Sequence, residues 1–275
     1  MLTVERQADI YAYISLKGSV SIHELAQKYR VSDQTIRRDL RQLEQKGQVI
    51  ITFGGAYIPE MEFPNYNVNI QVRRSLAMLE KKAIALLTLP LFNDNDFVYF
   101  DHSTTMISVA ELIAQQADYP HHFTVVTNSY VIAQILQNQP TIRVILLGGN
   151  VDSTNGCTSG PDTYQALHRY HFSKSFLSCS SLSLEQGITD SNLEMKTIRE
   201  TALHQSVERY LLVDHTKFNS ASSFQLCSIQ DLHGIITDSP VPPEWEKYLA
   251  EHNIQLLTSP NFPEQKREIE NGARS

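Results

Sequence analysis

Hydrophobic residues recur at helical spacing through the first 46 residues. They fall in three segments, 4–16, 22–29 and 33–46, with a short break after each. Apolar positions three and four residues apart lie on one face of a helix, so each segment predicts an amphipathic helix. The apolar positions are Ile10 and Ile14 in the first segment, Ile22, Leu25, Ala26 and Tyr29 in the second, and Ile36, Leu40 and Leu43 in the third.

Capping residues mark the ends of these helices. Ser21, with Glu24 three residues later, has the spacing of a capping box, and Ser32 is placed to cap the third helix. Gly18 and Gly47 follow the first and third segments, where glycine commonly ends a helix. These signals predict three short helices in close succession.

A short hairpin is expected after the third helix. Residues 49–52 form a β-prone run, and residues 53–57 are expected to turn the chain back through Gly54 and Gly55. Three helices followed by two short strands are typical of a winged helix-turn-helix. We therefore predict a winged helix-turn-helix domain over residues 1–57.

The remainder of the chain has a different pattern of apolar and polar residues. Residues 58–75 have the composition of a linker, and a single helix is expected over about 69–89. Apolar runs then alternate with loops and helical stretches, at 97–100, 123–126, 144–147, 176–177, 210–213, 235–236 and 254–257. Strands that alternate with helices predict an α/β domain with a mostly parallel sheet, here over 76–260, followed by a polar tail over 261–275.

Composition excludes several classes of protein. No apolar run reaches the ~20 residues of a membrane-spanning helix, and no secretory signal is recognisable, so we expect a cytoplasmic protein. The three cysteines, Cys157, Cys179 and Cys227, form no Cys-x-x-Cys pair. Their spacing argues against a disulfide framework and against a zinc site. We expect neither a metal nor a cofactor.

Charge is distributed unevenly along the chain. The net charge is −7, but residues 1–60 hold 8 basic and 7 acidic residues, whereas the rest hold 15 and 23. A slightly basic module joined to an acidic body is compatible with binding to nucleic acid.

The third helix carries a polar stripe opposite its apolar one. The stripe consists of Gln34, Arg37, Arg38 and Arg41. In the major groove Arg pairs with guanine and Gln with adenine, while Ser32 and Thr35, at the start of the helix, are placed to bind phosphate. From spacing alone, a solvated charged face on a small helical bundle is an equally good explanation.

Sequence motifs decide between these two explanations. Val-Ser occupies 31–32, Thr-Ile-Arg-Arg-Asp-Leu occupies 35–40, and Gly-Gly-Ala occupies 54–56. This combination resembles the DeoR family of bacterial transcriptional regulators. The resemblance implies binding to double-stranded operator DNA. The family often has Arg before the wing glycines, where this chain has Ile50, Ile51 and Thr52. Because of this departure, we expect the wing to bind phosphate more weakly.

Polar loops follow several of the predicted strands. Ligands of parallel sheets bind at the carboxyl ends of strands, where hydroxyls and amides can hold a phosphate group. Each loop alone is also explained as a helix cap or a turn, but their repetition favours a shared site. The candidate effector-binding residues are Asp101, His102, Ser103, Thr104, Thr105, Thr127, Asn128, Ser129, Gly148, Gly149 and Lys217.

The resemblance extends through this second domain, to about residue 260. It implies a sensor domain similar in fold to ribose 5-phosphate isomerase, which binds a phosphorylated sugar or polyol. The family usually has Gly where this chain has Ser103 and Ser181. Gly permits close approach of a ligand, so Ser at both positions implies a reshaped pocket.

The sequence therefore predicts a transcriptional regulator, in particular a repressor of a carbohydrate or polyol operon, and not an enzyme. Binding to two operator half-sites requires a protein with a twofold symmetry axis, so a homodimer or homotetramer is expected. The alternative is a sugar-phosphate isomerase or deaminase with an added DNA-binding module, in which Asp101, His102, Asp214 and Lys217 would be the candidate acid and base groups.

Overall fold

The computed structural model describes residues 3–17, 19–51, 54–57, 70–116, 119–259 and 262. The chain divides into two units, Met1–Met78 and Leu79–Ser275. The predicted helix end at Gly18, the predicted strand residue Thr52 and most of the predicted linker and polar tail lie outside the described residues. Each unit is described by itself.

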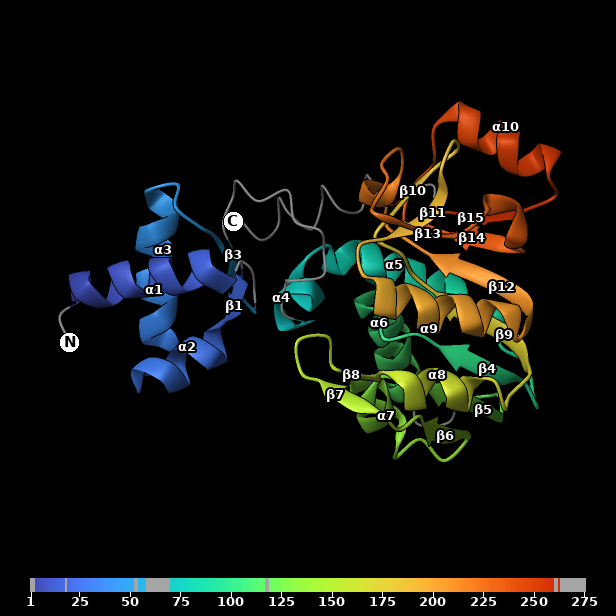
Figure 1. Ribbon diagram of the computed structural model, residues 1–275, viewed down its shortest axis with the longest axis horizontal. Helices are drawn as coiled ribbons and strands as arrows, with labels where there is room; N and C mark the ends of the chain where they lie inside the picture. Colours follow the sequence, from blue (N-terminus) through green and yellow to red (C-terminus); the bar gives the residue numbers. More distant parts are fainter. Residues whose placement is uncertain are drawn as a thin grey trace. The chain divides into compact units, whose positions relative to one another are not determined.

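The first unit contains the three predicted helices, α1 (Thr3–Lys17), α2 (Ile22–Tyr29) and α3 (Asp33–Gln45) (Figure 1). The apolar stripe of α3 is buried as predicted, with Ile36 and Leu40 fully inaccessible. Gly47 follows α3 with a φ of +70° and donates its amide to the carbonyl of Glu44, as expected of a glycine at a helix end. These helices enclose one small core.

Ser21 and Ser32 both cap helices. The Ser21 side chain accepts the amide of Glu24, but the carboxylate of Glu24 accepts from the hydroxyl of Tyr13 and the ammonium of Lys17. Half of the predicted capping box is therefore present, and Glu24 instead ties α2 to the end of α1.

The wing differs from its prediction. It is a three-stranded antiparallel sheet in the order β1 (Ser19–Ser21), β3 (Gly55–Tyr57), β2 (Ile50–Ile51). The predicted hairpin is present as the antiparallel pair β2–β3, and β1 adds a third strand that was not predicted, because it consists of only three residues, two of them serines. Gly55 and Ala56, predicted in the turn, belong to the central strand.

The single helix predicted over about 69–89 is also wrong. The structure has α4 (Ile70–Ser75) and α5 (Met78–Thr88), separated at Ala77, whose φ is +49°. A left-handed alanine interrupts the helical hydrogen-bond pattern. A short 3-10 turn, Leu89–Leu91, follows α5 and includes Pro90.

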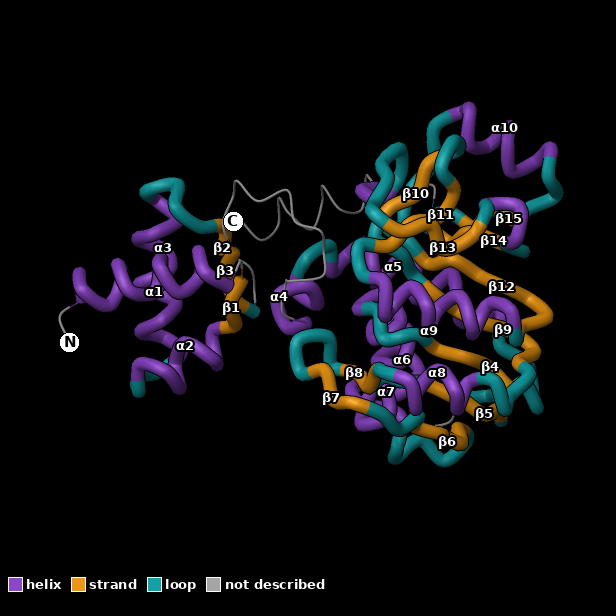
Figure 2. The backbone as a smooth tube through the Cα atoms, in the orientation of Figure 1, coloured by secondary structure: helices purple, strands orange, loops and turns teal. Residues whose placement is uncertain are grey.

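The second unit is built on a seven-stranded parallel sheet, which confirms the predicted α/β class (Figure 2). All seven predicted apolar runs contribute a strand. In spatial order the strands are β15 (Gln255–Leu257), β14 (Gly234–Ile236), β12 (Ser206–Leu212), β9 (Phe172–Leu177), β4 (Phe97–Phe100), β5 (Phe123–Thr127) and β6 (Ile142–Leu146).

Helices follow most of these strands. They are α6 (Thr104–Ala114), α7 (Tyr130–Leu136), α8 (Pro161–Leu167), α9 (Leu193–His204) and α10 (Pro243–Glu251). α8 and α9 pack side by side, and α9 contacts β9 and β12 (Figure 1). The apolar side chains of the central strand β4 are buried from Val98 to Phe100, whereas the edge strands β6 and β15 are partly exposed.

Two small antiparallel sheets were not predicted. One is a hairpin of β7 (Asn150–Asp152) and β8 (Cys157–Ser159). The other contains β10 (Ser181–Ser183), β11 (Gly187–Asp190) and β13 (Phe224–Cys227). Both lie beyond the carboxyl ends of strands of the large sheet in the sequence, in the region of the predicted effector loops.

Candidate nucleic-acid interface and effector site

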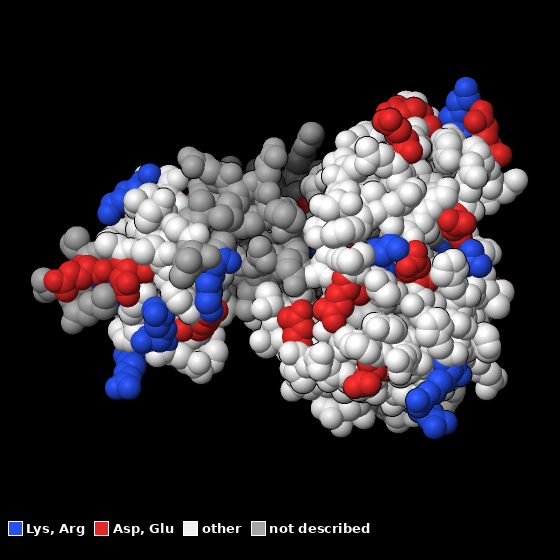
Figure 3. All heavy atoms as spheres, viewed as in Figure 1, with Lys and Arg blue, Asp and Glu red and all other residues white. Residues whose placement is uncertain are grey.

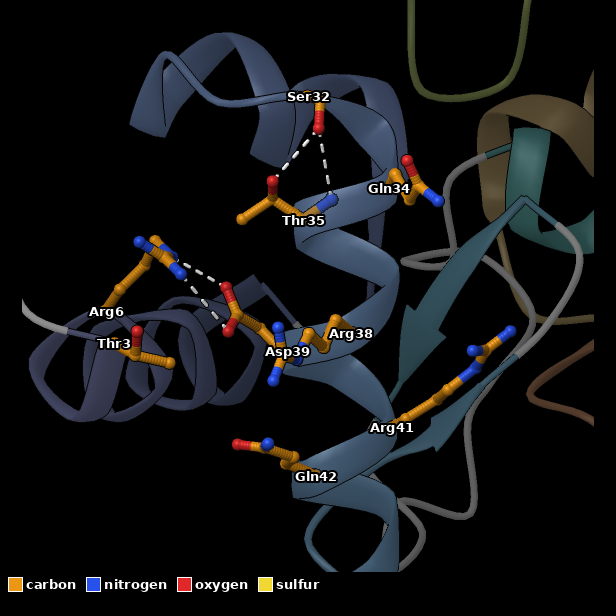
Figure 4. Close-up of a pocket in the computed structure, with 9 residues that line it drawn as sticks. All are labelled: Thr3, Arg6, Ser32, Gln34, Thr35, Arg38, Asp39, Arg41 and Gln42. Atoms are coloured by element: carbon orange, nitrogen blue, oxygen red, sulfur yellow. Dashed lines mark hydrogen bonds and ion pairs between the residues drawn. The ribbon is translucent and has the colours of Figure 1, made fainter.

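A hollow of about 620 Å³ lies on the exposed side of α3. Its lining combines the start of α3, the following two turns and the start of α1 (Figure 4). On the face drawn in Figure 3, basic and acidic side chains are interspersed over both units, so charge alone does not mark the interface. The lining residues are Thr3, Arg6, Ser32, Gln34, Thr35, Arg38, Asp39, Arg41 and Gln42.

The start of α3 is held by its own polar residues. The Ser32 hydroxyl accepts the amide of Thr35 at 3.2 Å and lies 2.9 Å from the Thr35 hydroxyl. Gln34, Arg38 and Arg41 are exposed. A capped helix with these side chains on its open face has the donors and acceptors needed to read base edges.

Five of the six predicted DNA-binding residues line the hollow, but Arg37 does not. Arg37 is half-buried, on the flank of α3. The structure adds Thr3, Arg6 and Gln42, which the sequence analysis did not select. A signal for Arg6 exists in the sequence: Asp39 lies three residues after Ile36 on the apolar stripe, and a buried carboxylate needs a cationic partner.

Asp39 is 1% exposed and joins α3 to α1. Its carboxylate accepts from Arg6 Nε at 2.6 Å and Arg6 Nη2 at 3.3 Å, and from the Gln7 side-chain amide at 3.2 Å. The Gln7 amide also donates to Gln42. The hydrogen bond to Asp39 raises the pKa of Arg6 above its already high ordinary value, so Arg6 is a permanent cation at the edge of the hollow.

In the second unit, Asp101 organises the carboxyl end of the sheet. The side chain is fully buried just after β4. Its carboxylate accepts from the amide of Ser103 at 2.9 Å, from the amide of Ser178 at 3.0 Å, and from Arg199 Nε at 2.9 Å. The loops after β4 and β9 are thereby joined to α9.

Arg199 connects two buried carboxylates. Besides Asp101, it donates to Asp190 at 2.7 Å, and its Nη2 lies 3.5 Å from Nε2 of His102. Burial alone would lower the pKa of Arg199, but Asp190 and Asp101 raise it, so the guanidinium stays charged. Burial raises the pKa of Asp190, and Arg199 offsets part of that effect. Arg199 and Asp190 were not predicted as site residues.

The hydroxyl-rich loop after β4 is buried at the start of α6. Ser103 caps α6 by accepting the amide of Met106 at 3.1 Å. Thr104 and Thr105 form the first turn of α6, and His102 precedes them beside Arg199. The structure thus brings the predicted residues 101–105 together at one helix start.

The predicted residues after β5 hold the β7–β8 hairpin in place. Asn128 accepts from the hydroxyl of Tyr99 at 2.9 Å and donates to the carbonyl of Thr158 at 2.9 Å. The Ser129 hydroxyl donates to the carbonyl of Gly156, and Thr127 accepts the amide of Ser129. These side chains are fully buried, so the geometry assigns them a scaffolding task.

The three remaining predicted positions have different environments. The carbonyl of Gly148 accepts from the Thr163 hydroxyl at 2.8 Å, and Gly149 has a φ of +146°, which side-chain-bearing residues rarely adopt. Lys217 is half-buried in the 3-10 turn His215–Lys217. Its charge acts on Cys179 after β9, where it opposes the rise in the pKa of that thiol caused mainly by burial. The next residue, Phe218, forms an isolated parallel bridge with Leu182 of β10, which places Lys217 beside the segment that follows β9.

Known proteins match both units. The DeoR-like helix-turn-helix domain family matches residues 6–62, and the DeoR C terminal sensor domain family matches residues 77–239. The chain belongs to the DeoR family. The resemblance expected from the motifs at 31–40 and 54–56 is thus confirmed.

DeoR relatives align over nearly their whole length. The HTH-type regulator YgbI of Escherichia coli K12, itself uncharacterized, is 32% identical over 95% of this chain and 100% of its own. IolR of Bacillus subtilis is 31% identical over 91% and 97%, and the lactose phosphotransferase system repressor of Staphylococcus aureus is 30% identical over 85% and 91%. These relatives are named transcriptional regulators.

Solved structures that match part of the chain include a ribose 5-phosphate isomerase from Methanocaldococcus jannaschii. It has a TM-score of 0.38 and 11% identity, over 50% of this chain and 53% of its own. A translation initiation factor eIF-2B from Pyrococcus horikoshii gives a TM-score of 0.40 and 10% identity, over 75% of this chain and 68% of its own.

Among the described residues, no helix is long and apolar enough to cross a membrane.

Proposed function

We propose that this protein is a repressor that binds operator DNA through α3 and is released by a phosphorylated sugar or polyol bound in its second unit. The observation that carries the first half is the capped helix α3, with Gln34, Arg38 and Arg41 exposed above a buried apolar stripe. Membership of the DeoR family supports regulation as the activity.

The lining of the hollow suggests separate tasks for its residues. Gln34, Arg38 and Arg41 face outward and would contact base edges. Ser32 and Thr35, at the positive end of α3, would bind phosphate oxygens. Arg37, on the flank, would also bind backbone phosphate. Two copies of α3 are needed to read two half-sites, so the active species would be a homodimer or homotetramer.

Of the two possible directions of control, repression and activation of transcription, we propose repression. The relatives include a repressor of a lactose phosphotransferase system in Staphylococcus aureus and an activator of an L-fucose operon in Haemophilus influenzae. Both relatives are named for carbohydrate use, which supports a sugar-derived effector. The α6 start, Arg199 and Lys217 supply amides, hydroxyls and cations of the kind that hold phosphate.

An enzymatic role is not part of the proposal. Asp101, the first candidate acid or base, is fully buried and already accepts three hydrogen bonds from Ser103, Ser178 and Arg199. A general base must reach the proton that it abstracts, and this carboxylate instead holds loops together.

Two measurements test the proposed function. The full-length protein is incubated with a random DNA library, and the selected duplexes are titrated in a mobility-shift assay with and without each of a panel of phosphorylated sugars and polyols. We expect a selected site with twofold symmetry, and one sugar phosphate that both lowers affinity for DNA and raises the melting temperature. Failure to select any sequence would contradict DNA binding. Turnover of ribose 5-phosphate or glucosamine 6-phosphate would restore the enzymatic alternative.

A further inference from the structure

The first unit ends in a helix that is packed against the wing. α4 contacts both β1 and β3, and its Ile70 and Val72 are buried, Val72 completely. The surface that receives α4 is formed by Gly54 and Gly55. In the sequence this pair looks like part of a hairpin turn. In the structure α4 packs directly against the two glycines, and α4 in this position is called seated.

The missing side chain of Gly54 is what lets α4 approach. A Cβ at residue 54 would lie 2.6 Å from the carbonyl oxygen of Gln71, 3.1 Å from its carbonyl carbon and 3.7 Å from Oγ of Ser75, all in α4. Two of these are backbone atoms, which cannot swing aside. Gly54 is not among the glycines with positive φ, so glycine is needed here for close approach and not for backbone freedom.

Gly55 repeats this arrangement one residue later. A Cβ at residue 55 would lie 2.8 Å from Cγ2 of Val72 and would also collide with the carbonyl of Val20 in β1. One glycine therefore accommodates the α4 backbone, and the next accommodates the buried Val72 side chain together with β1. Two independent close approaches at adjacent positions define α4 as a fixed part of the first unit.

α4 is also the last regular element before the second unit. The Ser75 hydroxyl donates to the carbonyl of Val72 at 2.7 Å, and the amide of Leu76 donates to the same carbonyl at 3.2 Å. The helix ends at Ser75, two residues before the left-handed Ala77. The second unit begins at Leu79. The chain therefore passes from the first unit to the second through α4.

We propose that Gly54 and Gly55 position the DNA-binding unit by seating α4, and that the seated helix sets the separation between two copies of α3 on an operator. The inference rests on the proposed function, because it requires two half-sites. Its consequence is that unseating α4 loosens the preferred half-site spacing without changing how one α3 reads one half-site.

Gly54→Ala is the informative variant, because the three nearest neighbours of the added methyl are all in α4. Gln71→Ala is its matched control, because it changes an exposed side chain of the same helix and leaves the backbone carbonyl in place. The probes are duplexes carrying one or two copies of a half-site selected by the wild-type protein, with the spacer varied over about one helical turn, ~10 bp. Hydrogen exchange of the full-length proteins without DNA reports α4 amides separately from those of α2 and α3.

We expect the wild type and Gln71→Ala to bind the best spacing about a hundredfold more tightly than a single half-site. Gly54→Ala should keep single-site affinity within about twofold, lose most of the spacing preference, and show faster exchange in α4 only. If Gly54→Ala fails to fold, Val72→Ala unseats α4 by removing packing and should give the same pattern. An unchanged spacing preference in a variant whose α4 amides exchange faster would overturn the inference. Absence of any selected half-site for the wild type would instead overturn the proposed function.

Discussion

Arg6 of α1 and Asp39 of α3 form a two-point ion pair, with Nε 2.6 Å and Nη2 3.3 Å from the two carboxylate oxygens. The pair lies at the edge of the hollow, where Arg6 is 12% and Asp39 1% exposed. A guanidinium has five N–H donors, so those not used by Asp39 remain available at the hollow. Asp39 therefore orients a cation toward the proposed DNA interface and also holds α1 against α3.

Asp39→Ala should destabilise the first unit by about 1–3 kcal/mol, because the Arg6 guanidinium and the Gln7 amide lose a charged acceptor. Hydrogen exchange of α1 amides measures this locally, since the change is confined to the first unit. Asp33→Ala, at an exposed position of the same helix, is the control and should cost less than about 1 kcal/mol. Equal effects of the two variants would show that the Arg6–Asp39 pair contributes nothing to stability.

Arg38 and Arg37 should differ in what their removal does to DNA binding. Arg38→Ala removes an exposed side chain of the hollow and should cost about 1–3 kcal/mol on the selected site, with relaxed preference at one base pair. Arg37→Ala should weaken binding to all sequences alike and reduce the salt slope by about 1. Mobility-shift titrations at several salt concentrations, on selected and scrambled duplexes, distinguish the two. The assignment is wrong if Arg37→Ala changes base preference and Arg38→Ala does not.

Most of the large elements were predictable because each depends on local pattern. The strands of the seven-stranded sheet include short runs of buried apolar residues, such as Val98, Tyr99 and Phe100 in β4 and Ile235 and Ile236 in β14, and these runs are visible in the sequence. β7, β8, β10 and β11 contain Asn, Asp, Ser and Thr, because they are short antiparallel strands, and they lack such runs. The break at Ala77 has no signal either, since alanine is a good helix former.

The candidate sites were predictable only where one segment carries the chemistry. The proposed DNA-contacting residues, within 32–41, lie in one helix or at its cap, so their spacing alone predicts a shared face. Arg199 reaches Asp101 across 98 positions of sequence, so no local spacing connects them. Arg6 and Asp39, 33 positions apart, were missed for the same reason. Pairs that depend on tertiary folding require the structure.

Arg199→Met should be strongly destabilising to the second unit. It leaves Asp101 and Asp190 buried without their shared cation, and breaking a buried ion pair in this way costs about 3–5 kcal/mol. Chemical denaturation followed by tryptophan fluorescence reports this unit, because the single tryptophan, Trp245, lies in α10. Lys196→Met, which breaks an i,i+4 pair with Glu200 on the same helix, is the matched control and should cost less than about 1 kcal/mol.

The same Arg199 substitution also tests the effector site. Asp101 and Arg199 fix the β4 and β9 loops, so a variant that stays folded at low temperature should lose the stabilisation by the sugar phosphate that protects the wild type. Lys196→Met should retain that stabilisation. Unaltered effector binding by folded Arg199→Met would show that these loops do not form the site.

The thiol of Cys227 makes the second unit sensitive to high pH. Burial, followed by the negative charge of Asp231, raises the pKa of Cys227 from 9.0 to about 12. Between these two values the unfolded thiol is ionised and the folded one is not. Stability contributed by this group is therefore present below pH 9 and is lost as the pH rises toward 12. The free energy of unfolding should fall by up to about 1.4 kcal/mol for each pH unit above 9 on account of this group.

Urea titrations at pH 8 and pH 10, monitored through Trp245, measure this loss. Other buried groups with raised pKa values, among them Cys179 and Tyr99, also lower stability at high pH, so the comparison is with Cys227→Ala. That variant should lose about 1 kcal/mol less than the wild type between the two pH values. Iodoacetamide gives an independent reading: because alkylation requires the thiolate, native Cys227 should react at pH 8 at least about a hundredfold more slowly than in urea. Equal alkylation rates in the two states would contradict the raised pKa, and with it the pH dependence expected from this thiol.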